Sequence, residues 1–230
     1  RPPKGYPGPV TGSSRPPSWQ PQLLQRLREH FARGPVRDGA HDLGHVLRVA
    51  RLAAEIAEEE GGDRDTCHAA ALLHDLVYLP KNHPDSPRTA ALAAAQVPGW
   101  CAFDTGLAAK TAAIAHCVEA HSFSGGVEPR TLEARVVQDA DRLEALGAIG
   151  IARTFATGGS FGGALWHPVD PWAEGRDLDD KAWSLDHFPK KLLKLAATLH
   201  TSAGRRRAEA RQRVMLAFLE DLRGELGAEP

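Results

Sequence analysis

Long apolar runs, paired cysteines and an excess of charge of one sign are all missing from this sequence. No apolar stretch approaches the roughly 20 residues that a helix needs to cross a bilayer, so we expect neither a membrane span nor a membrane partner. The 28 basic residues nearly balance the 29 acidic ones, giving a net charge of −1. Bulk electrostatics therefore gives no sign of nucleic-acid binding. The three cysteines form no C-x-x-C motif, which favours reduced thiols in the core and a cytoplasmic location.

Length and local composition predict one folded domain preceded by a tail. A chain of 230 residues can bury one substantial core, so a single domain over residues 19–230 is expected. Residues 1–18 are rich in proline, glycine and serine and are predicted to be a disordered tail. An extended docking peptide is the alternative interpretation of this segment.

Apolar residues recur at helical spacing along most of the chain, and the expected fold class is all-α. Glycine pairs and aromatic residues without a clear period fill residues 147–184, where we expect a long ordered loop beside the functional site, a candidate lid. One helix is expected to begin after Asp63 or Asp65 and to stop before Pro80. The other expected helices cover about residues 19–33, 42–60, 87–96, 104–119, 131–146, 185–199 and 205–226.

The adjacent pair His74 and Asp75 stands in an apolar helical run and is the strongest functional signal. Burial of an unpaired carboxylate is costly, so a divalent cation is one natural partner and a satisfied core hydrogen bond is the other. His45 on an earlier helix, with Asp139 and Asp141 on a later one, could supply further donors. Imidazole and carboxylate ligands without thiolate suit manganese, iron, cobalt, nickel or zinc.

The order H…HD…D, formed here by His45, His74, Asp75 and Asp141, resembles the pattern of the HD-domain metal-dependent phosphohydrolases. Further strings over about residues 41–220 resemble the bacterial HD proteins of the YpgQ and YedJ type. These strings are HDLGHVLRV, AALLHD, PKNHP, HSFSGG, VVQDADRLEALGAIGIARTF and LDHF. The resemblance implies an HD-domain helical bundle and one divalent transition metal, manganese first, with nickel, cobalt, iron or zinc as alternatives.

The activity that this resemblance implies is hydrolysis of nucleoside or deoxynucleoside triphosphates to the monophosphate and pyrophosphate. A small-molecule phosphomonoesterase or 5′-nucleotidase and a non-catalytic nucleotide-binding HD module remain alternatives. An oxygenase with two irons is a further alternative, because some HD-fold proteins oxidise small diols. The expected partner is a small phosphorylated substrate, and a homodimer stays open.

The resemblance also assigns the metal ligands as His45, His74, Asp75 and Asp141. In this superfamily the last ligand is commonly the aspartate of an A-D-x-L segment, which matches Asp141. Asp139 would then support the site from a neighbouring position, and the reverse assignment stays open.

Candidate catalytic groups are His74 and Asp75 themselves, together with Asp42, His121 and Asp139. Asp42 precedes His45 by about one helical turn, so it can orient that histidine or act as acid or base. His121 would ligate a second metal ion if one is bound and would contact phosphate otherwise; one ion is expected.

His41 is also followed by an aspartate, but it stands at the start of a helix, outside the apolar run. It is interpreted as an exposed or capping residue.

Candidate substrate-binding residues carry N–H groups that could hold phosphate. Lys81 lies in the segment that follows the helix expected to carry His74 and Asp75. Arg142 follows Asp141 directly. The full set of candidates is Lys81, His121, Arg142, His187 and Lys191. Solvated surface charge is the alternative interpretation of the lysines.

Overall fold

The computed structural model describes residues 16–35, 41–79, 83–122 and 125–227. They fall into two compact units, an N-terminal unit that ends at Asp141 and a C-terminal unit that begins at Arg142. Most of the predicted tail lies outside the described residues. The expectation that residues 19–230 form a single domain stays a prediction.

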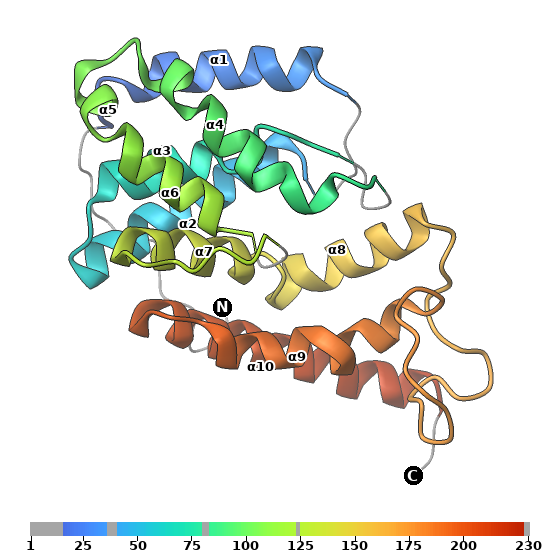
Figure 1. The fold of residues 1–230 in the computed structure, drawn as a ribbon. Coiled ribbons are helices and arrows are strands. Elements are labelled where there is room, and N and C mark those ends of the chain that lie inside the picture. The colour runs from blue at the N-terminus through green and yellow to red at the C-terminus, as the bar shows by residue number, and fades with distance from the viewer. Residues whose placement is uncertain (1–15, 36–40, 80–82, 123–124, 228–230) are drawn as a thin grey trace. The chain divides into compact units, whose positions relative to one another are not determined.

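The N-terminal unit is built from helices (Figure 1). Within it α3 packs against both α2 and α6, and α4 packs against α6. The helices are α1 (Gln20–Arg33), α2 (Leu43–Glu60), α3 (Arg64–Leu73), α4 (Thr89–Cys101), α5 (Thr105–Ala109), α6 (Thr111–Ala120) and α7 (Leu132–Leu143), with a short 3-10 turn at Ser86–Arg88.

Local sequence sets the ends of the helices that lead to the functional site. Asp42 caps α2, and Gly61 ends it in the left-handed conformation with φ of 75°. Asp63 then caps α3 by accepting hydrogen bonds from the N–H groups of Asp65 and Thr66. Because α3 is apolar on nearly every side, it lies buried between its neighbours.

Several expected helices of this unit have different bounds in the structure. The third ends at Leu73, so His74 caps its C-terminus and the His74–Asp75 pair begins the segment that leaves it. The helix expected over residues 104–119 breaks at Lys110, whose ammonium pairs with Asp63 at 2.7 Å. The helix expected over residues 87–96 continues to Cys101 as α4. The helix expected over residues 131–146 ends at Leu143 as α7.

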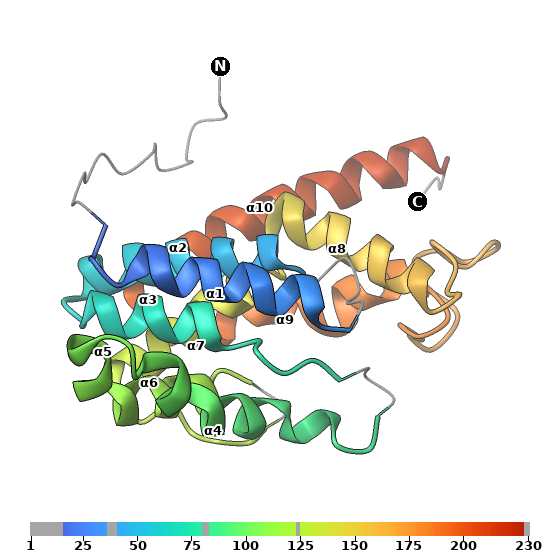
Figure 2. The same cartoon turned by 90° about the horizontal axis from the view of Figure 1, so that it is seen from above.

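In the C-terminal unit α8 (Gly147–Ser160) packs against α10 (Ser202–Glu225), and both are labelled in Figure 2. Phe155, Phe188 and Phe218 form an aromatic cluster there, each pair of ring centroids lying 6.0 Å apart. The expected helix over residues 185–199 is instead a series of four short helical segments of different types. They are Ser184–Asp186, Phe188–Leu192, α9 (Leu193–Leu195) and Ala196–Thr198.

The prediction of a loop throughout residues 147–184 is wrong for its first part, where α8 forms. Gly147, at a φ of 72°, lets the chain turn between α7 and α8. The loop proper covers residues 161–183, and an isolated bridge between Ala164 and Trp183 joins its two ends. A role for it beside the functional site stays a prediction.

The all-α fold class is confirmed, and no strand forms among the residues that the structure describes. None of the described helices combines the length and the apolar character of a membrane span. The three cysteines are buried and unpaired. Burial raises the pKa of the Cys117 thiol to about 12, so this thiol is a neutral filler of the core.

Candidate metal centre

Two histidines at the ends of helices present the same ring nitrogen to one point of the N-terminal unit. His74 caps α3 and His121 caps α6. The Nδ1 atom of His74 lies 2.7 Å from the carbonyl oxygen of Ala71, and that of His121 lies 2.6 Å from the carbonyl of Val118. A carbonyl only accepts, so Nδ1 carries the proton in both rings and Nε2 has its lone pair free for a ligand role.

The third histidine comes from the first turn of α2. The Oδ1 atom of Asp42 accepts a hydrogen bond from the backbone N–H of His45 at 2.7 Å. Asp42 thus fixes the backbone from which the His45 side chain projects, which is one of the two roles expected for it.

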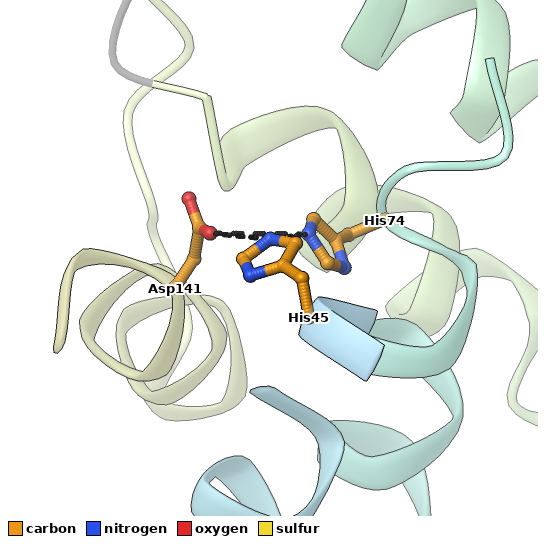
Figure 3. Close-up of side chains that lie close together, drawn as sticks. All are labelled: His45, His74 and Asp141. Atoms are coloured by element: carbon orange, nitrogen blue, oxygen red, sulfur yellow. Dashed lines mark hydrogen bonds and ion pairs between the residues drawn. The ribbon is translucent and has the colours of Figure 1, made fainter. Parts of the chain in front are cut away.

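Side chains from several segments bring potential ligand atoms together in two groups that share His74, and Figure 3 shows the side chains of the first group pointing toward one another. The groups are His45, His74 and Asp141, and His74, Asp75 and His121. The Nε2 atoms of His45 and His74 lie 3.3 Å apart. Oδ1 of Asp141 lies 3.4 Å from Nε2 of His45 and 3.8 Å from that of His74. Oδ2 of Asp75 lies 3.7 and 3.5 Å from the same two nitrogens.

These distances fit one metal ion. Neighbouring ligands of one ion, each about 2.1 Å from it, lie about 3.0 to 3.4 Å apart, close to the distances from the two histidine nitrogens to each other and to the carboxylate oxygens. The donor set of two imidazoles and two carboxylates also suits a divalent transition metal.

Electrostatics keeps the donors in the form that a cation requires. Burial lowers the pKa of His74 to about 4, so its imidazole is neutral. Burial alone would raise the pKa of Asp75, but His74, His45 and His121 together bring it below its usual range. The pKa of Asp141 is likewise held well below its usual range, because the histidines outweigh its burial. Neutral imidazoles and ionised carboxylates are the protonation states of metal ligands.

The remaining catalytic candidates take different positions. His121 belongs to a second group of potential ligands with His74 and Asp75, and its ring centroid lies 4.9 Å from that of His74. Asp139 is fully buried on α7 and belongs to neither group of potential ligands formed by the described residues. The geometry therefore favours Asp141 over Asp139 as the ligand.

The other substrate-binding candidates lie outside the described part of the N-terminal unit. Lys81 lies outside the described residues. Arg142 belongs to the C-terminal unit, where it donates to the carbonyl of Thr198 at 2.6 Å. In the same unit the Nδ1 atom of His187 lies 2.9 Å from a carboxylate oxygen of Asp180. Lys191 is exposed there.

Sequence reasoning missed one side chain beside the cluster. The imidazole of His41 is half-buried and lies edge-on to that of His45, with ring centroids 6.0 Å apart. It does not cap α2, because Asp42 does. No sequence signal gave this position, because His41 precedes the residue that caps α2 and helical spacing does not extend to it.

Comparison with known proteins gives this arrangement a family. The family model described as HD domain matches residues 42–146, which include all four donor residues. YpgQ of Bacillus subtilis is 35% identical over 191 residues, covering 81% of this chain and 84% of that protein. The chain belongs to the HD domain family.

Solved structures of similar proteins extend the match to the fold of this HD protein. The crystal structure of B. subtilis YpgQ in complex with ADP has a TM-score of 0.67 at 31% identity, covering 89% of this chain and 93% of that one. An HD-superfamily hydrolase from Bacillus thuringiensis has a TM-score of 0.66 at 31% identity, covering 91% and 97%. The family and the neighbouring hydrolases confirm the HD fold and identify the chain as a metal-dependent phosphohydrolase.

Proposed function

We propose that this HD protein hydrolyses nucleoside or deoxynucleoside triphosphates to the monophosphate and pyrophosphate, with one divalent metal ion. The observation that carries the proposal is the four-donor cluster in a chain that is similar to YpgQ, whose crystal structure contains ADP. ADP combines a base, a ribose and two linked phosphates. Its presence in the relative supports a nucleotide substrate over a simple phosphomonoester.

His45, His74, Asp75 and Asp141 would hold the metal ion, and manganese is the ion we propose. When bound, such an ion lowers the pKa of a coordinated water and neutralises charge that develops on a phosphoryl group. The reaction adds one water across the bond between the α and β phosphates. The products are the monophosphate and pyrophosphate.

Two residues of the chain would support this chemistry directly. The Nδ1 proton of His121 is committed to the carbonyl of Val118, so Nε2 faces the cluster as an acceptor. It can take a proton from water or, once protonated, donate to a phosphate oxygen. Asp42 would act as a positioning residue, because its carboxylate accepts from the backbone N–H of His45.

The activity is tested on metal-reconstituted protein with four classes of substrate: ribonucleoside triphosphates, deoxynucleoside triphosphates, monophosphates and aryl phosphates. Phosphate and pyrophosphate are assayed separately. We expect equal amounts of monophosphate and pyrophosphate from triphosphates and no free phosphate. Release of phosphate from monophosphates would instead indicate a 5′-nucleotidase. Full metal content without turnover of any substrate would indicate a nucleotide-binding module.

The ligand assignment is tested with a matched pair of substitutions on α7. Asp141→Asn is expected to lose most of the bound metal. Asp139→Asn is expected to retain it and to lose about 10- to 100-fold in metal affinity or rate, as is usual when a residue next to a ligand is changed. Elemental analysis of both purified variants decides between the two aspartates, and the opposite pattern would make Asp139 the ligand.

A further inference from the structure

The metal cluster has a closed side and an open side. The side chains of His45 and His74 are each only 1% exposed, whereas those of Asp75 and Asp141 are 19% and 29% exposed. The histidines therefore close one side of the cluster, and the carboxylate side chains are partly exposed on the other. A substrate that reaches the cluster has to approach from the carboxylate side.

His41 lies at the edge of the cluster, against one of its histidines. Its ring lies edge-on to that of His45, with the ring centroids 6.0 Å apart. The ring of Tyr78, in the segment that leads away from Asp75, lies 6.2 Å from His41 at a tilt of 43°. Both His41 and Tyr78 are half-buried, so part of each side chain is exposed.

A triphosphate needs N–H donors at this place. The charge of a divalent ion is already balanced by the two carboxylates that would ligate it. The several negative charges of a phosphate chain would therefore remain uncompensated without further donors. An imidazole offers at least one N–H in either protonation state, and the bond to an anionic oxygen is stronger than one between neutral groups.

We propose that His41 is a substrate-binding residue that donates a hydrogen bond to a non-bridging oxygen of the nucleotide's phosphate chain, with Tyr78 holding its ring in place. This inference rests on the proposed nucleotide substrate. It gives His41 a role distinct from ligation, because His41 belongs to neither group of potential ligands found among the described residues.

The test measures ADP affinity, which does not require turnover. Calorimetric titration of the metal-loaded protein with ADP compares the wild type with His41→Ala, His41→Gln, His41→Asn and Tyr78→Ala. Metal content is measured on the same samples. The control is His200→Ala, which removes an exposed imidazole from the C-terminal unit.

We expect His41→Ala to weaken ADP binding roughly 10- to 100-fold with metal content unchanged, the usual effect of losing a hydrogen bond to a charged group. Gln places an amide donor near the Nε2 position and Asn near Nδ1, so one of these two variants should restore part of the affinity. Tyr78→Ala should show a smaller loss, and His200→Ala none.

Three results would overturn the inference. Unchanged ADP affinity in metal-loaded His41→Ala would mean that His41 only packs against its neighbours and does not bind the nucleotide. Loss of metal in that variant would mean that it acts through His45. A wild-type protein that binds ADP but releases no pyrophosphate would refute the proposed reaction and leave the role of His41 decided by the titration. Failure of the metal-loaded wild type to bind ADP at all would overturn both.

Discussion

The buried imidazole of His68 should lower the free energy of unfolding as the pH falls, by an amount that can be measured. Its side chain is buried beside Trp19 and is only 7% exposed. Burial lowers the pKa of His68 to about 4, and the nearby charge of Arg64 lowers it further. The ordinary value of 6.5 applies to the unfolded chain. The folded protein therefore resists protonation of His68 at pH values where the unfolded chain accepts it.

The sign and size of the effect are given by linkage between protonation and folding. Above pH 6.5 the imidazole is neutral in both states and has no effect. As the pH falls from 6.5 toward 4, the unfolded state binds more protons, so the free energy of unfolding decreases. Between pH 7.5 and pH 4.5 the loss attributable to His68 is about 2.5 kcal/mol.

Urea unfolding of the wild type and of His68→Gln at pH 7.5, 6.5, 5.5 and 4.5 measures this contribution. The substitution has its own cost at every pH, so the relevant quantity is the change with pH in the difference between the two proteins. The pH dependence of the metal cluster cancels in that difference because both proteins share it. We expect His68→Gln to lose about 2.5 kcal/mol less than the wild type on acidification, whereas His200→Gln should behave like the wild type. If the free energy of unfolding changed with pH equally in the wild type and in His68→Gln, the reasoning would be refuted.

Three further predictions concern the site and the turn after α7. Lys81→Ala and Arg142→Ala should keep their metal and lose roughly 10- to 150-fold in kcat/KM for a triphosphate. The loss should be smaller for an aryl monophosphate, which lacks distal phosphates. Equal losses on the two substrates would exclude contact with those phosphates. His121→Ala should keep one metal ion per chain by elemental analysis and lose turnover, whereas a fall from two ions to one would establish a second ion. Gly147→Ala should destabilise the protein by about 1–2 kcal/mol in urea unfolding, because a side chain is strained at a φ of 72°. Gly159→Ala, in open space on α8, should not destabilise it.

Helical periodicity was sufficient to predict most of the N-terminal unit. The apolar spacing places α1 and α2 within a residue or so of their observed bounds, and Asp63 caps α3 as one of two expected candidates. The break at Lys110 could not be predicted, since it depends on an ion pair with a residue 47 positions earlier. Contacts over such separations leave no periodic signal.

Composition misled the prediction for α8. Its four glycines and its mixture of aromatic and small residues are unusual in a helix interior, where glycine is unfavourable. Tertiary packing against α10 outweighs that preference. The aromatic content of the remaining loop, residues 161–183, correctly indicated an ordered segment.

The part of the candidate site that follows from the order of residues along the chain could be predicted. The part that depends only on proximity in the folded structure could not. The residues His45, His74, Asp75 and Asp141 could be selected from their order and from the family resemblance. The closeness of His41 could not, because nothing in an HD dipeptide at a helix start distinguishes a ring that faces the cluster from one that faces solvent.

The backbone bonds that orient His74 and His121 have a consequence for how this site can change during evolution. The acceptors are carbonyl groups of Ala71 and Val118, and no side-chain substitution removes a carbonyl. The residues around the last turns of α3 and α6 can therefore drift without altering the tautomer of either ring. Insertions and deletions are different, because each residue added to or removed from a helix rotates its C-terminal end by about 100°. One deleted residue near the end of α3 would carry His74 away from its partners, so the lengths of these two helices should vary far less than their sequences.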